Sequence, residues 1–197
     1  MTENQTLKKT TNLIRELAIS SIRRVEGSER KFILSFSSEE PYERWFGSEI
    51  LDHAEGAVDL SRLNEIGVVL FNHDRDKVLG KIVRAWIEND RGNAEIEFDT
   101  DTFSETIYQK VKSGTLKGVS VGYIVTDWED VTVGKKSDDG RFSGPCNIAK
   151  HWTPHEISVV SIPADPTVGV GRELNNNQHT LDYYKNIITI NKNKIGR

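Results

Sequence analysis

Acyl transfer requires a nucleophile such as serine and a base such as histidine. In this 197-residue chain the candidates that we single out are Ser120 and His73. Ser120 lies within Gly118-Val119-Ser120-Val121-Gly122, a match to the G-x-S-x-G nucleophile elbow. His73 follows Asn72, which comes directly after the apolar run of residues 67–71. A serine hydroxyl is too weakly acidic to attack an amide unaided, and an imidazole within hydrogen-bond reach can take its proton near neutral pH. Taken alone, however, each residue fits an ordinary structural role.

The residues around Ser120 decide how the motif is interpreted. In an α/β hydrolase the elbow serine sits on a sharp turn from a strand into a helix. Here Tyr123-Ile124-Val125-Thr126 continues as a strand, and the histidine candidate precedes the serine, so an esterase of that class is disfavoured. On a regular strand Ser120 and Gly122 share one face, and Val119, Val121 and Tyr123 pack on the other.

A histidine base works best when a third group fixes its tautomer. His151, His155 and Glu156 all follow Ser120 on a late apolar segment. Strand alternation predicts that His155 and Glu156 lie on opposite faces, so only one of them can face His73. A carboxylate buried there needs the imidazole N–H as a partner, and the alternative for Glu156 is a surface position.

Composition excludes several other classes of function. Thirty acidic and 26 basic residues give a net charge of -4, which offers no footprint for nucleic acid. Cys146 is the single cysteine, so neither an internal disulfide nor a cysteine zinc cluster is expected. Asp74 and Asp76 beside His73 and His53 show no recognised metal-ligand spacing. No apolar run could span a membrane and no signal peptide is evident, so we expect an intracellular protein.

The elements that must position these side chains are mostly strands. Residues 13–26 fit either an amphipathic helix or an irregular strand, of which we predict the strand, followed by a hairpin turn at 26–28 and a strand over 30–36. We then expect a packed loop at 41–51 that ends in a short extended segment, a helical turn capped by Asp59, and a buried strand over 67–71. Further along, the pattern predicts a hairpin of 79–88 with 94–99, a helix from a capping box at 102–105 to Gly114, and strands over 116–126 and 152–162. Residues 127–150 read as a polar excursion.

Several longer motifs occur in a recognisable order. They are Tyr42-Glu43-Arg44, Gly47-Ser48-Glu49-Ile50-Leu51, Leu70-Phe71-Asn72-His73-Asp74, Leu79-Gly80-Lys81, Gly114 to Tyr123, Glu156-Ile157-Ser158-Val159-Val160 and Ile162-Pro163-Ala164-Asp165-Pro166. Over roughly residues 28–172 the sequence resembles the prohead protease family of tailed bacteriophages, the type that processes HK97-like capsids. The polar excursion at 130–147 departs from the family pattern.

This resemblance implies an α+β fold, a herpesvirus-protease-like (assemblin-like) β-barrel of mostly antiparallel strands surrounded by a few helices. It implies a serine endopeptidase with His73 and Ser120 as the catalytic pair and Glu156 as the third member. Herpesvirus relatives use a second histidine in that place, so His155 and His151 remain alternatives. No cofactor and no metal are implied. The expected domain covers residues 13–172, between a disordered segment at 1–12 and a weakly ordered tail at 173–197.

The family role gives the expected partners. Such proteases act inside the assembling prohead in the host bacterial cytoplasm, cut scaffold segments from the major capsid protein, and then cut themselves. Polar ends like those of this chain are accessible places for self-cleavage. The alternative is a non-catalytic capsid or scaffold component that keeps the same barrel, with Ser120 and His73 in structural roles.

Overall fold

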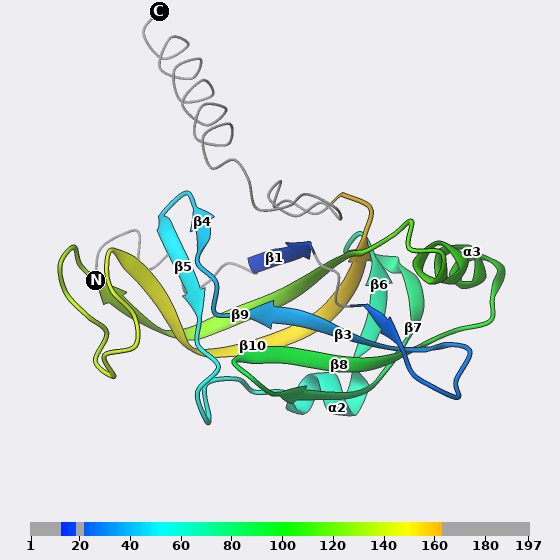
Figure 1. Cartoon of the computed structure of the whole chain (residues 1–197), viewed down its shortest axis with the longest axis horizontal. Helices are drawn as coiled ribbons and strands as arrows, with labels where there is room; N and C mark the ends of the chain where they lie inside the picture. The colour runs from blue at the N-terminus through cyan, green and yellow to red at the C-terminus, as the bar shows by residue number, and fades with distance from the viewer. Residues whose placement is uncertain (1–12, 19–21, 163–197) are drawn as a thin grey trace, which may run out of the picture.

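The computed structural model describes residues 13–18 and 22–162, which form an α+β fold dominated by one curled ten-stranded sheet (Figure 1). The main path of the sheet runs β1-β9-β10-β6-β7-β8-β3-β2, and β4 and β5 extend it beside β10. Among these strands every pairing is antiparallel except those of β10 with β5 and β6. The predicted terminal segments at 1–12 and 173–197, and the boundary at 172, lie outside the described residues.

The elements have the following bounds. The strands are β1 Leu13–Ala18, β2 Arg23–Arg24, β3 Lys31–Ser38, β4 Tyr42–Arg44, β5 Gly47–Leu51, β6 Val68–Phe71, β7 Asp74–Ile87, β8 Arg91–Phe98, β9 Gly118–Val131 and β10 Cys146–Val160. The helices of the described ranges are α2 Ser61–Ile66 and α3 Thr102–Lys112. No helix in the described ranges is long and apolar enough to cross a membrane.

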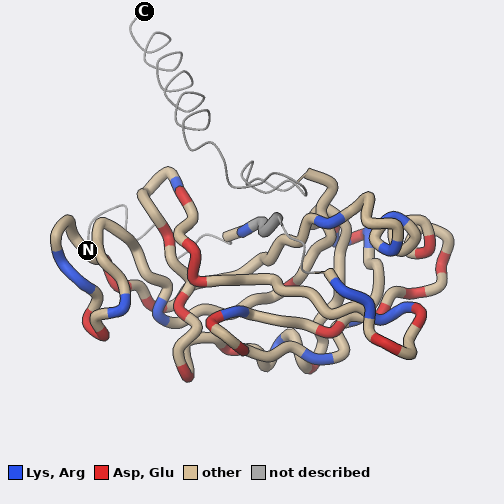
Figure 2. Tube along the Cα trace, in the orientation of Figure 1, with Lys and Arg blue, Asp and Glu red and all other residues tan. Residues whose placement is uncertain are grey.

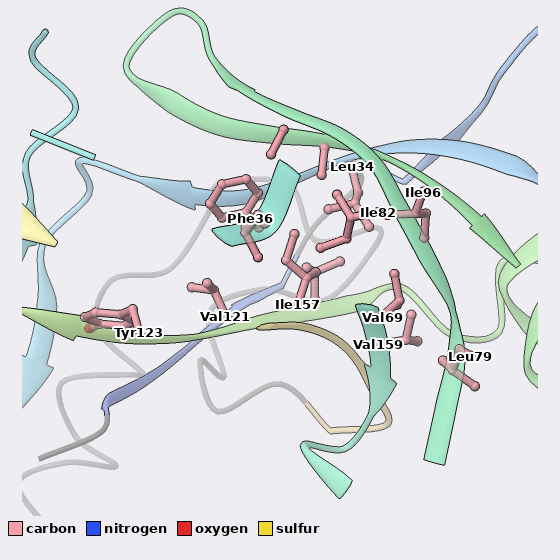
Figure 3. Close-up of a cluster of buried hydrophobic side chains, with 14 of the residues drawn as sticks. Leu34, Phe36, Val69, Leu79, Ile82, Ile96, Val121, Tyr123, Ile157 and Val159 are labelled. Atoms are coloured by element: carbon pink, nitrogen blue, oxygen red, sulfur yellow. The ribbon is translucent and has the colours of Figure 1, made fainter. Parts of the chain in front are cut away.

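The core fills the concave side of the sheet. Val121 and Ile157 from the central strands meet Leu34 and Phe36 of β3, and all four side chains are buried (Figure 3). Because β3 and β9 are far apart in strand order yet contact each other, the sheet must curl across this core. Helix α2 packs against β7 and β10, and α3 packs against β7 and β8. The core thus fixes β9 and β10 as rigid neighbours.

Most of the predicted elements are present. The hairpin of β7 and β8 turns through Asn89 and Asp90, both with positive φ, as their side-chain types favour. The predicted capping box is wrong in detail, because the cap of α3 is Asp101, whose carboxylate accepts the amides of Phe103 and Ser104. The helix ends before Gly114, which has a φ of +75°.

Two predictions are wrong in part because strand pairing outweighs local polarity. The extended segment expected at the end of residues 41–51 is β5, but the expected loop before it contains β4, which pairs with β5, and β5 gains β10 as a parallel neighbour. Much of the predicted excursion at 127–150 is strand, since β9 runs to Val131 and β10 begins at Cys146. The turn between them is held by Arg141, which is paired with Asp139 and with the fully buried Asp52.

Charged residues of both signs alternate along the described trace rather than gathering on one side (Figure 2). This distribution accords with the small net charge of -4. Among the side chains that the structure describes, no group of three or more His, Cys, Asp or Glu is placed to hold a metal ion.

His53 is a structural histidine rather than a ligand. Its side chain is buried, with Nε2 2.7 Å from the Ser37 hydroxyl and Nδ1 2.9 Å from the Leu51 carbonyl oxygen. Burial lowers the pKa of His53 to about 4. The folded protein therefore holds this ring neutral at pH values where the unfolded chain protonates it.

This pKa predicts an acid-sensitive fold. Between about pH 6.5 and pH 4 the unfolded chain binds a proton at His53 that the folded chain does not bind, so stability falls as the pH falls through this window. We expect a loss of roughly 3 kcal/mol over that range, at about 1.4 kcal/mol for each unit of pKa difference. Urea unfolding at pH 7, 5.5 and 4 measures it. A His53→Gln variant should lose most of this slope, and an unchanged slope would contradict the assignment.

Candidate active site

Ser120 lies on a regular strand, as predicted. It is the third residue of β9, which continues without interruption to Val131, so it does not sit on a strand-to-helix elbow. Strand β9 lies between β1 and β10, with Glu16 and Ser158 as the residues opposite Ser120. The neighbours Val119, Val121 and Tyr123 belong to the buried core. Ser120 therefore faces away from the core, on the side of the sheet that carries the other candidate residues.

His73 is presented by a strained turn at the end of β6. Asn72 and His73 have φ values of 53° and 60°, in the left-handed region that non-glycine residues seldom adopt. Strand β6 runs parallel to β10, and the Asn72 amide extends that pairing with a 3.0 Å bond to the Val159 carbonyl. The Asn72 side chain accepts the Ser161 amide at 2.9 Å. These bonds hold His73 above β10.

The His73 ring is fixed by a carboxylate. His73 Nδ1 lies 2.6 Å from Glu156 Oε1, and the other oxygen, Oε2, accepts the Ser158 hydroxyl at 2.7 Å. The Ser158 hydroxyl oxygen in turn accepts the His73 backbone amide at 3.2 Å. With Nδ1 donating to the carboxylate, Nε2 is left as the proton acceptor. In the described part of the chain, Nε2 is buried and has no hydrogen-bond partner.

Ser120 itself is fully buried, and its hydroxyl donates a 3.1 Å hydrogen bond to the Arg15 carbonyl of β1. The hydroxyl is therefore not bonded to His73 Nε2 in this structure. The three predicted residues nevertheless come from one sheet region, since β9, β10 and β6 are consecutive neighbours. Ser158 lies opposite Ser120 and contacts both Glu156 and His73, and so links the nucleophile candidate to the histidine–carboxylate pair.

The two alternative histidines are placed differently. His151 is exposed and pairs with Asp127, at 3.5 Å, away from His73. His155 lies in an irregular step of β10 between Pro154 and Glu156, and burial lowers the pKa of its ring. This bulge puts both His155 and Glu156 next to Gly122, so the prediction that they occupy opposite faces is wrong. Of the three candidates, Glu156 has the hydrogen bond to His73.

Ser158 completes the site and was given no role from the sequence, and Gly122, predicted to share a face with Ser120, has a further role beside Glu156. Period-two spacing from Glu156 places Ser158 on the same face, which was a usable signal. Gly122 lies opposite Glu156, where a Cβ would be 2.5 Å from Glu156 Oε1. The glycine thus leaves the space that the carboxylate occupies.

Replacing Gly122 with alanine should displace the Glu156 carboxylate. The atoms in the way are side-chain ends of Glu156 and His155, which can move, so we expect little change in the free energy of unfolding. If His73 is the base that the sequence predicts, loss of the His73–Glu156 geometry should lower the rate of serine-dependent cleavage by roughly 100-fold. Cleavage rates and urea unfolding measured together test this. An active Gly122→Ala protein would show that the 2.6 Å contact is dispensable.

The fold and the site define an α+β protein that carries the residue types of a serine hydrolase on one face of a curled sheet. The model of one family, the caudovirus prohead serine proteases, matches residues 26–182. The chain belongs to that family. A curated relative, the major capsid protein of Halomonas phage phiHAP-1, is 37% identical over 152 residues, which are 75% of this chain and 24% of the relative. The chain thus spans about a quarter of the length of that relative. No solved structure matches the chain.

Proposed function

We propose that this chain is a serine endopeptidase of prohead maturation that cleaves scaffold segments of the capsid protein and cleaves itself. The observation that carries the proposal is the 2.6 Å contact of His73 Nδ1 with Glu156, which leaves Nε2 without a partner among the described residues and so free to act as a base. Glu156 lies on β10, the strand next to the Ser120 strand β9, and His73 follows β6 on the other side of β10. A histidine that was merely structural would be expected to satisfy both ring nitrogens when buried.

In the proposed reaction Ser120 Oγ attacks the carbonyl carbon of the scissile peptide bond while its proton passes to His73 Nε2. Glu156 holds the ring by Nδ1 and stabilises the imidazolium. His73 then protonates the leaving amine, and the peptide C–N bond breaks to give an acyl-enzyme ester on Ser120. A water molecule, deprotonated by His73, hydrolyses the ester and restores the free hydroxyl. Ser158 is a positioning residue in this scheme, since it bonds to Glu156 and to the His73 amide.

The substrate assignment rests on the comparisons. Family membership supports a role in the prohead, and the relative named major capsid protein supports a capsid protein as partner. The site of action that fits is the interior of the assembling shell in the host cytoplasm. A herpesvirus-protease-like closure of the curled sheet is the finer fold assignment that goes with this proposal.

The proposal is tested by producing the full chain together with the major capsid protein of the same phage. Intact-mass measurement should find the capsid protein shortened only when the chain is present. A fluorophosphonate should stop the trimming and add its mass to the peptide that contains Ser120. A capsid protein of unchanged mass, or trimming that persists after complete modification of Ser120, would overturn the proposal.

A non-catalytic capsid component is the second candidate, favoured by the name of the phiHAP-1 relative. In that case the chain would bind the capsid protein and leave it intact. The same co-production separates the two functions, because binding without any mass change in the capsid protein supports the structural role.

A further inference from the structure

We infer that strand β1 occupies the place of an extended substrate, and that a peptide reaches Ser120 only by replacing β1 at the edge of β9. This inference rests on the proposed function. It begins from the hydrogen bond that the Ser120 hydroxyl donates to the Arg15 carbonyl, 3.1 Å away. The Ser120 hydroxyl thus donates its hydrogen bond to β1 rather than to His73 Nε2.

The Ser120 hydroxyl is bonded to a group other than the base, and the base has no partner of its own among the described residues. The Ser120 hydroxyl is fully buried and donates to a backbone carbonyl, and His73 Nε2 is buried without a partner among the described residues. Attack on a peptide requires the reverse, with the proton directed to Nε2 and Oγ directed to a carbonyl carbon. In the structure the Ser120 hydroxyl hydrogen instead points to the Arg15 carbonyl oxygen. The structure therefore holds the nucleophile in an unreactive arrangement.

Backbone pairing shows what could replace β1. Strand β1 runs antiparallel to β9 from Leu13 opposite Tyr123 to Ala18 opposite Gly118, and it is the outermost strand of the described sheet on that side (Figure 1). Removal of β1 would leave the backbone groups of residues 118–123 unpaired at an open edge. An extended polypeptide can satisfy such an edge with its own main chain, in the manner of strand addition. The strand itself shows that a peptide backbone fits there.

One buried side chain of β1, that of Arg15, is incompletely hydrogen-bonded within the described part of the chain. Arg15 is only 2% exposed, and among the described residues its Nε and Nη1 groups have no hydrogen-bond partner, although Nη2 donates to the Glu40 carbonyl. Buried donors without partners cost free energy. Burial also lowers the pKa of the Arg15 guanidinium. An incoming strand without a buried arginine would avoid this cost, so exchange is favoured over a permanent β1.

A reversible tether in the full chain tests the exchange. Residues 17 and 119 are paired across β1 and β9, so Leu17→Cys with Val119→Cys places two thiols within the usual disulfide separation. Oxidation should lower the rate of Ser120 modification by a fluorophosphonate at least about tenfold, and reduction should restore it. The control tether, Lys31→Cys with Glu97→Cys, joins the antiparallel pair of β3 and β8 and should change nothing.

Hydrogen exchange on the unaltered chain gives a second measurement that does not depend on the tether. A peptide phosphonate with the sequence preceding the mapped capsid cut should speed amide exchange in residues 13–18 and leave residues 118–123 protected. If the oxidised tether reacts as fast as the reduced one, or if residues 13–18 stay protected in the complex, the exchange is refuted and the protease assignment stands. If Ser120 is not modified even in the unaltered chain at long times, the proposed function itself fails.

Discussion

Replacing Ser120 with alanine should abolish capsid-protein trimming, with a fall in the cleavage rate of at least roughly 10⁴-fold. Alanine removes the only atom that can form the acyl-enzyme in the proposed reaction. The fold should change little, because the hydroxyl donates a hydrogen bond to the Arg15 carbonyl, and such a bond contributes about 1 kcal/mol. Rates come from intact-mass time courses of the co-produced capsid protein, and stability comes from urea unfolding.

A matched control for this change is Ser35→Ala. Ser35 is a buried strand serine like Ser120, but it lies on β3 and bonds to backbone carbonyls of residues 37 and 92. Its replacement should leave the cleavage rate within about threefold of the unaltered chain. Equal trimming by the Ser120→Ala and Ser35→Ala proteins would remove Ser120 from the catalytic role and leave the chain as a capsid component.

Replacing Glu156 with glutamine should slow cleavage by roughly 10³- to 10⁴-fold while the protein stays folded. The amide is nearly isosteric, so the backbone and the contact with Ser158 have room to persist. An amide is neutral, however, and does not stabilise the imidazolium that forms when His73 takes the serine proton. Its NH₂ group can also donate to Nδ1, which would place the ring proton on Nε2 and remove the base.

The two alternative histidines supply the controls for Glu156. His151 pairs with Asp127 at the exposed part of β10, so His151→Gln should leave cleavage unchanged. His155 adjoins Gly122 in the bulge, and the His73 ring is bonded to Glu156 instead, so His155→Gln should lower the cleavage rate roughly tenfold at most. If His155→Gln is as damaging as Glu156→Gln is expected to be, the orienting role moves to the histidine.

Local pattern predicted the elements that are stabilised by nearby residues. The β7–β8 hairpin followed from turn residues that tolerate positive φ, and the strand character of residues 118–123 followed from alternation. The parallel pairing of β5 with β10 did not, because it joins residues about a hundred positions apart, which no short window contains. The extensions of β9 and β10 were missed because the segment that joins the two strands is polar, although their ends pair with each other.

The features of the site could likewise be predicted from the sequence only in part. Residue types and motif order pointed to Ser120, His73 and Glu156, and the structure brings His73 and Glu156 into contact. The bond from Ser120 to Arg15 was not predictable, since it joins side chain and backbone over 105 residues of sequence. The bulge before Glu156 follows Pro154, and a proline within a predicted strand was a usable signal of a bulge that the strict alternation of His155 and Glu156 did not take into account.

The turn that presents His73 has a consequence for attempts to make this protein more robust. Asn72 and His73 hold left-handed backbone angles, which most non-glycine residues avoid, although asparagine and histidine adopt them more often than most. A search for thermostable variants would therefore be drawn to Asn72, where glycine adopts such angles freely. The same change would delete the side-chain oxygen that holds the Ser161 amide, and with it part of what aims the imidazole. At this single residue, a change that favours heat resistance would thus loosen the position of His73, the base of the proposed reaction.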